Sequence, residues 1–284
     1  MNTLKTIPHD TKKIFWKYGA CSHTFFYILN REFGYPKENE QRASDPLAGG
    51  LMRGYQCGML WGSALAVGAE SFRRSADRGQ AISLAIMATQ HVMESFLKRA
   101  KSVNCRDVCG CDLSSKSGMA KLLLKTVIGG FFYSPCFILA EKWTPEAIQS
   151  ATEGLSHTQT DYPQLPMSCA SEVAKKMGAS EEEMIMVAGF AGGMGLSGNA
   201  CGALGAAIWM NTLTWIRKHP GETPPSFNQE NTTKLLKAFY DATGSEHLCH
   251  KITGQYFKTI NDHTEFIKNA GCDKLINVLA LEGA

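Results

Sequence analysis

The amino-acid sequence predicts an all-α protein made of two duplicated helical halves. Apolar residues recur at three- and four-residue steps over several segments, whereas the alternation typical of β strands is scarce. The cysteines also repeat in spacing. The interval between Cys57 and Cys201 is 144 residues (201 minus 57), and the interval between Cys105 and Cys249 is again 144 (249 minus 105). These observations predict helices arranged in two copies of one unit.

The outer cysteines follow the same order, although their spacing is looser. Cys21 corresponds to Cys169 at an interval of 148 residues (169 minus 21), and Cys136 corresponds to Cys272 at 136 (272 minus 136). Four matched pairs in order indicate an internal duplication. We therefore expect one unit at 1–153 and a second at 154–284, related by a pseudo-twofold axis. Cys109 and Cys111 have no counterparts and belong to the first half alone.

The expected helices can be placed from their apolar spacing and their breakers. In the first half they are 12–33, 80–101, 116–127 and 137–143. In the second half they are 169–176, 231–242, 255–268 and 273–281. Ser180 and Glu183 have the spacing of a capping box. Pro163 and Pro166 mark the linker between the halves at 154–166.

The bulk composition limits the kinds of partner. A content of 44% hydrophobic and 19% charged residues is that of a folded globular chain, and the net charge of +3 does not suggest nucleic acid. The first residues lack the apolar core of a signal peptide, so we expect a cytoplasmic protein. The stretch 184–216 has no charged residue, but its many glycines and its Asn and Thr residues favour buried helices over a membrane span.

Two segments share one motif around the central cysteines. Each has a glycine pair, a further glycine, then Cys57-Gly58 or Cys201-Gly202, followed by small and apolar residues. Because glycine lacks a Cβ atom, Gly58 and Gly202 would let a bulky group or another helix approach closely. The segment 193–198 also matches GxGxxG, but no strand-turn-helix context accompanies it, so close packing explains it better than a dinucleotide site.

The cysteine pattern resembles the redox-active protein family named C_GCAxxG_C_C. Members of that family are about half as long as this chain and carry four cysteines, so the chain resembles a tandem fusion of two such units. It departs from the pattern at three positions: Met59 replaces the motif's Ala, Ala206 stands where its last Gly belongs, and His23 replaces an expected Gln. A related unit in the split-Soret cytochromes is associated with an iron–sulfur centre. No Cys-x-x-Cys-His is present here, so covalent c-type haem is not implied.

Four thiolates are what one iron–sulfur cluster requires, and each half has four matched cysteines. The resemblance and this count imply one cluster per half, used for electron transfer or redox sensing. The candidate cofactor residues are Cys21, Cys57, Cys105, Cys136, Cys169, Cys201, Cys249, Cys272, Gly58 and Gly202. Cys109 and Cys111 join the cysteines as candidate metal ligands, and His247 and His250 flank Cys249.

Three other interpretations stay open at this point. The cysteines could work as thiol–disulfide oxidoreductase pairs without metal, or could hold a metal that stabilises an interaction module. They could also be small buried apolar residues, which the duplication disfavours. A structural zinc site is disfavoured because such sites use closer cysteine pairs. The expected partner is a redox protein, with a homodimer as one arrangement, and the sequence names no substrate that would make the chain an enzyme.

Overall fold

The computed structural model describes residues 10–113, 115, 117–118, 120–121, 124, 134–156, 165–222, 224 and 230–283. Within these ranges the regular structure is helical, and the only β pairing is an isolated antiparallel bridge between Gln56 and Asn104. The all-α prediction is therefore confirmed. Among the helices of these residues, none combines the length and the apolar character needed to cross a membrane.

The described elements of the first half precede those of the second in the same general order. The first half has α1 (Thr11–Tyr18), α2 (Cys21–Phe33), α3 (Glu38–Arg42), η1 (Asp45–Leu47), η2 (Gly50–Gly54), α4 (Gly58–Arg74), α5 (Arg78–Ala100), α6 (Cys105–Cys109) and α8 (Pro135–Leu155). The second half has α9 (Cys169–Lys176), α10 (Glu181–Met186), η4 (Ala188–Phe190), α11 (Gly202–Lys218), α12 (Glu230–Thr243), α13 (Cys249–Thr253), α14 (Ile260–Lys268) and α15 (Asp273–Gly283).

Corresponding helices agree in length where the two central motifs lie. Helices α4 and α11 both have 17 residues, and α6 and α13 both have five. The expected capping box of Ser180 and Glu183 is present at α10. The pseudo-twofold axis itself stays a prediction. The expected helix at 116–127 falls largely outside the described residues.

The predicted single helix over 12–33 was wrong, because the chain breaks there into α1 and α2. Gly19 takes a left-handed conformation with φ 72°, and Ala20 is extended. A left-handed glycine ends a helix readily because it lacks a Cβ atom. The break makes Cys21 the first residue of α2 rather than a residue inside a longer helix. The predicted helix at 137–143 is also longer than expected, running from Pro135 to Leu155.

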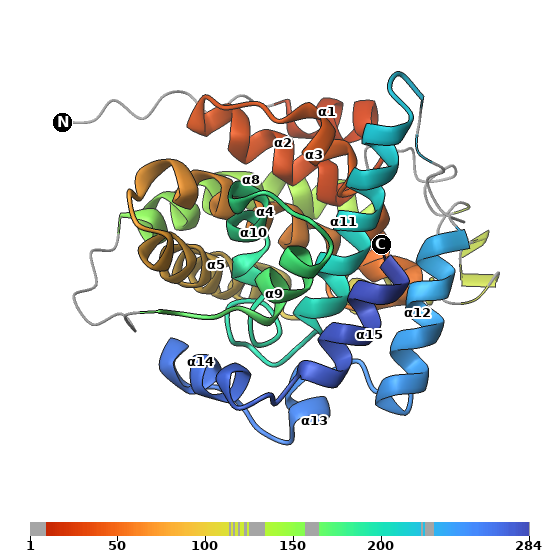
Figure 1. The fold of residues 1–284 in the computed structure, drawn as a ribbon. Helices are drawn as coiled ribbons and strands as arrows, with labels where there is room; N and C mark the ends of the chain where they lie inside the picture. Colours follow the sequence, from red (N-terminus) through yellow and green to blue (C-terminus); the bar gives the residue numbers. More distant parts are fainter. Residues whose placement is uncertain are drawn as a thin grey trace.

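The two halves share one core rather than packing separately. The largest cluster of buried apolar side chains takes residues from both halves. Trp61 of α4 meets Phe190 edge to face, with ring centroids 4.7 Å apart. A Cβ atom on Gly205 of α11 would lie 2.4 Å from the Trp61 ring, so only glycine lets the two helices pack this closely. Figure 1 shows α4 and α11 in the middle, with α1–α3 and α13–α14 at opposite ends.

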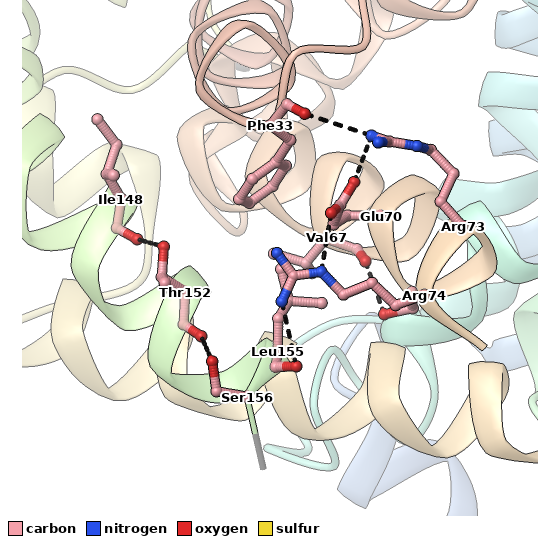
Figure 2. Close-up of polar contacts among 10 residues, drawn as sticks. Phe33, Val67, Glu70, Arg73, Arg74, Ile148, Thr152, Leu155 and Ser156 are labelled. Atoms are coloured by element: carbon pink, nitrogen blue, oxygen red, sulfur yellow. Dashed lines mark hydrogen bonds and ion pairs between the residues drawn. The ribbon is translucent and has the colours of Figure 1, made fainter. Parts of the chain in front are cut away.

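A buried carboxylate joins the far ends of three helices that carry cysteines at their beginnings. Glu70, in the last turn of α4, accepts from Arg73 at 2.5 Å and from Arg74 at 2.8 Å (Figure 2). Arg73 also donates to the carbonyl of Phe33, which ends α2, and Arg74 to that of Leu155, which ends α8. A buried carboxylate requires such pairing. The cluster thereby fixes the relative placement of α2, α4 and α8.

Candidate functional site

Each of the eight matched cysteines lies at the beginning of a helix. Cys21, Cys105, Cys169 and Cys249 are the first residues of α2, α6, α9 and α13. Cys57 and Cys201 are the residues before α4 and α11, Cys136 is the second residue of α8, and Cys272 directly precedes α15. Unpaired N–H groups give a helix beginning a partial positive charge, which favours a thiolate or another anion.

In the first half, Cys21 and Cys57 form a hydrogen-bonded thiol pair. The bond from Cys57 lowers the pKa of Cys21, while the same bond and burial raise the pKa of Cys57. The pair therefore loses a proton from Cys21 before it loses one from Cys57. Burial, followed by the nearby charges of Cys21, Cys109 and Cys111, raises the pKa of Cys136. All these thiols are thus close enough to influence one another electrostatically.

The extra cysteines of the first half join this same group. Cys105, Cys109, Cys111 and Leu113 form one buried cluster, and Cys136 packs against it. Cys105 and Cys109 share a second hydrogen bond, which lowers the pKa of Cys109 to about 6 and raises that of Cys105. Cys109 Sγ also lies 3.3 Å from the Cys111 carbonyl oxygen. The first half therefore gathers six cysteines, of which sequence reasoning matched four.

The second half gathers its four cysteines without extra members. Burial raises the pKa of each of them, to about 12 for Cys201. The charges of Cys169, Cys201 and Cys272 add to the rise at Cys249, so all four are electrostatic neighbours. No disulfide links any of the ten cysteines, all of which lie within the described ranges. In those ranges, no group of three or more His, Cys, Asp or Glu side chains is arranged to hold a metal ion.

A left-handed backbone turn precedes the central cysteine in both halves. Positive φ angles run through 49–52 in the first half and through 192–196 in the second. They include non-glycine residues, with φ 59° at Leu51 and 71° at Met194. Such a conformation costs about 1–2 kcal/mol per non-glycine residue, and backbone strain of this kind gathers at functional sites. The GxGxxG match at 193–198 lies in this second turn.

Both turns present a backbone N–H group to the first cysteine of their half. The N–H of Gly49 bonds to Cys21, and that of Gly192 bonds to Cys169; each of these bonds lowers the pKa of the cysteine it reaches. Close packing also requires glycine directly after each central cysteine, because a Cβ atom there would clash with a neighbouring atom. A Cβ atom on Gly58 would lie 2.5 Å from Cys21 Sγ, and one on Gly202 would lie 2.0 Å from the Phe190 carbonyl oxygen.

The two groups of cysteines meet through His247, which the sequence analysis named, and through Tyr55, Tyr240 and Gln56, which it did not. Tyr55 stacks on His247, with ring centroids 3.9 Å apart, and its hydroxyl lies 2.8 Å from that of Tyr240. Gln56, fully buried beside Cys57, contacts Met194 of the second left-handed turn. Only the position of Tyr55 and His247, each two residues before a matched cysteine, could have pointed to this contact.

Comparison with known proteins gives one family. The family model described as "Putative redox-active protein (C_GCAxxG_C_C)" matches residues 19–126 and again residues 167–281. No curated protein and no solved structure matches the chain. The two matches together cover well over half of the sequence, and each contains three or four matched cysteines and one left-handed turn. The chain therefore belongs to the C_GCAxxG_C_C family of redox-active proteins and carries the family unit twice.

Proposed function

We propose that each half binds one iron–sulfur cluster through its four matched cysteines, and that the protein transfers or senses electrons. The observation that carries this proposal is the grouping of the thiols. Four cysteines that are far apart in the sequence influence one another's pKa in each half, and each begins a helix. Cysteine thiolates in sets of four are the usual ligands of iron–sulfur clusters.

Several features around the thiols support this proposal. Most of the thiols are buried from water, and the helix beginnings that surround them favour the negative charge of thiolates. Gly49 and Gly192 supply N–H groups near sulfur, and hydrogen bonds of that kind tune the reduction potential of a cluster. Gly58 keeps the space beside Cys21 free of side-chain atoms.

A bound cluster would supply one-electron exchange, while the chain would hold the ligands and control their protons. Burial raises the pKa of Cys169, Cys201, Cys249 and Cys272, so these thiols are protonated near neutral pH without metal. Loading must therefore release protons, and metal affinity should rise with pH. We place this activity in the cytoplasm, with a separate redox protein as the electron partner and a homodimer as one arrangement.

A specific observation favours a second candidate, a thiol–disulfide oxidoreductase without metal. The first half contains two hydrogen-bonded thiol pairs, Cys21 with Cys57 and Cys105 with Cys109. In such a reaction each pair would lose two electrons and two protons as it forms a disulfide, and a disulfide of the partner would be reduced to two thiols. The second half has no hydrogen-bonded thiol pair of this kind among its four cysteines, all within the described ranges.

Anaerobic purification followed by iron and sulfide analysis separates these candidates. The proposal predicts brown protein, absorption bands from thiolate-to-iron charge transfer, and inorganic sulfide equal to iron. A colourless, iron-free preparation whose cysteines cycle between thiol and disulfide would favour the oxidoreductase. A stoichiometric metal without sulfide and without redox change would instead indicate a metal-stabilised interaction module.

A further inference from the structure

We propose that the first half also binds an uncharged aromatic alcohol, a ligand of the phenol class, in a pocket outside the cysteine groups. The pocket has a volume of about 490 Å³ and lies between α1, α2, α3 and η1. The three α-helices lie together at one end of the molecule (Figure 1), and none of the cysteines lines the pocket. The site goes beyond the redox function and does not rest on it.

The first sign of a ligand is a buried histidine with one free nitrogen. His23 is 5% exposed and lines the pocket, and its Nδ1 atom lies 3.0 Å from a carboxylate oxygen of Asp45. Because a carboxylate accepts, Nδ1 carries the proton, and the Nε2 atom of the neutral ring is left as an acceptor. Among the described residues Nε2 meets no donor, and it is not one of the unpartnered atoms that are closed to solvent. It is therefore open to a donor from outside the chain.

A hydrogen-bond donor suits this nitrogen better than a metal ion does. A metal site in a protein generally needs three or four ligands from the chain. Within the described ranges, no group of three or more His, Cys, Asp or Glu side chains is arranged to hold a metal ion, so His23 and Asp45 have no third ligand beside them. The free nitrogen is thus suited to an O–H or N–H group of an organic ligand.

A second free group lies one helical turn away. Tyr27 follows His23 by four residues on α2, so the two side chains share one face of the helix, and both line the pocket. The Tyr27 hydroxyl has no hydrogen-bond partner among the residues that the structure describes. A ligand hydroxyl can donate to His23 Nε2 and accept from Tyr27 at the same time, whereas an ether or a carbonyl can only accept. The two groups together therefore select a hydroxyl.

The charged residues of the lining favour a ligand without charge. Lys17 and Arg42 bring two positive charges and Glu38 and Asp45 bring two negative ones, so the lining has no net charge. Lys17 lies over a tyrosine ring of the same pocket at 5.0 Å, Arg42 donates to a backbone carbonyl, and Asp45 is engaged by the histidine. Glu38 is exposed to solvent. No charge is left that would favour an ionised ligand over a neutral one.

The remaining lining accounts for a flat ligand body. The Tyr18 ring stacks on the His23 ring, with centroids 4.0 Å apart, and Tyr27 lies 5.0 Å from Tyr18. Pro36 adds a further apolar wall. Aromatic side chains bind planar rings through stacked or edge contacts. A flat ring with one hydroxyl therefore matches both the polar groups and the walls of the pocket.

The second half does not repeat this site. Counted from the first cysteine of each half, His23 corresponds to Ser171 and Tyr27 to Lys175. Ser171 donates to the Met184 carbonyl at 2.6 Å, and Lys175 is exposed. The acceptor and the donor are thus both replaced in the second copy. The site belongs to the first half and not to the repeated unit, which agrees with His23 being a departure from the family pattern.

The test is calorimetric or ligand-observed NMR titration of the full chain with phenol, anisole and cyclohexanol. Phenol should bind saturably. Anisole should bind about tenfold more weakly, because its ether oxygen cannot donate to His23. Cyclohexanol keeps the hydroxyl but lacks the flat ring, and it should bind about threefold more weakly or less tightly still.

Two substitutions separate the polar contacts. His23→Phe keeps a ring beside Tyr18 but removes the acceptor, so phenol and anisole should then bind equally. Tyr27→Phe removes the donor and should weaken both ligands by about fivefold, because each has an oxygen that accepts. The Tyr27 hydroxyl bonds to none of the described residues, so its loss should leave the fold intact. Tyr256→Phe, the same change between α13 and α14, should leave binding unchanged.

Three results would overturn the site. These are no saturable phenol binding, equal binding of phenol and anisole by the unaltered chain, or a preference for phenol that survives His23→Phe. The thermal unfolding midpoint and the iron content of each variant are measured in parallel. A chain that binds phenol but holds no iron after anaerobic purification would contradict the redox proposal alone. A chain that holds iron but does not bind phenol would contradict this site alone.

Discussion

The two halves have the same backbone plan around their cysteines but different thiol chemistry. Both place four cysteines at helix beginnings, with a left-handed turn before the central cysteine. In the second half, burial raises the pKa of all four thiols. In the first half, two hydrogen-bonded pairs lower the pKa of Cys21 and Cys109 and raise that of their partners.

The difference shows that geometry and protonation are set by separate features of the chain. The helix beginnings and turns come from the duplicated motif and are alike in both halves. The thiol pairs depend on sulfurs within hydrogen-bond distance, and Cys109 belongs to the first half only. Without metal, the first half therefore favours partly ionised thiols, whereas the second favours neutral ones.

The largest expected effect is the loss of one iron–sulfur centre when a central cysteine is replaced in one half. Cys57→Ser and Cys201→Ser should each remove about half of the iron and sulfide, because a cluster that loses one of four thiolate ligands is poorly held. Iron and sulfide analysis of anaerobic protein measures this. The Cys109→Ser, Cys111→Ser double variant should keep both centres, since the second half is built from four cysteines alone. Loss of all iron in either single variant would indicate one shared centre.

The alkaline stability of the reduced, metal-free protein should depend on every thiol with a raised pKa, which includes Cys57, Cys105 and Cys136 of the first half and all four thiols of the second half. These thiols keep their protons when folded, with the pKa of Cys201 at about 12, whereas an unfolded thiol ionises at about pH 8.5. The stabilisation present at neutral pH is then lost as the pH rises from about 8.5 toward 12, by about 1.4 kcal/mol per pH unit for each thiol. Urea unfolding at several pH values measures the slope.

Two variants sharpen this comparison. Cys201→Ala should reduce the alkaline slope because it removes one thiol whose pKa is raised. Cys109→Ser should not reduce the alkaline slope. The pKa of Cys109 is lowered to about 6, so the stabilisation from this thiol is lost as the pH falls from about 8.5 toward 6 instead. An unfolding free energy that does not change between pH 8 and pH 10 would contradict the protonation assigned to the second half.

The second half should also have an acid-sensitive residue. His263 is 1% exposed, and burial lowers its pKa to about 4. The folded chain keeps this ring neutral while the unfolded chain takes up a proton below about pH 6.5. Stability should therefore fall as the pH drops from about 6.5 through 4, by roughly 3 kcal/mol in total. Chemical unfolding of His263→Gln should show a smaller decrease, and an unchanged decrease would exclude this cause.

The smallest expected effect distinguishes the two motif glycines. Gly202→Ala should destabilise by about 1–3 kcal/mol, because the new Cβ atom meets the backbone carbonyl of Phe190 and the chain must shift. Gly58→Ala should be nearer the lower end, because its new Cβ atom would lie 2.9 Å from the nearest backbone atom, the Cα of Ala48, and 2.5 Å from the Cys21 sulfur. It should also alter iron binding in the first half. Gly19→Ala, where only the left-handed φ opposes a side chain, is the control. Equal stability of all three variants would contradict the close packing.

The sequence by itself determined the duplication, the all-α class and the eight matched cysteines. Regular spacing of apolar residues and of cysteines can be read without knowing the fold, since helix period and repeat length are properties of the chain alone. The sequence also indicated that Gly58 and Gly202 lie at closely packed positions. It did not place the break at Gly19, because the apolar pattern continues across that residue and only the backbone conformation shows the end of α1.

Only the tertiary structure decided which thiols pair and how the halves meet. The pairing of Cys21 with Cys57 and the contact of Tyr55 with His247 both join residues from different elements. The left-handed turns likewise place leucine and methionine where local preference would put glycine. Local sequence fixes the helices, but contacts between distant segments arise from packing, because one shared core sets the distances between them.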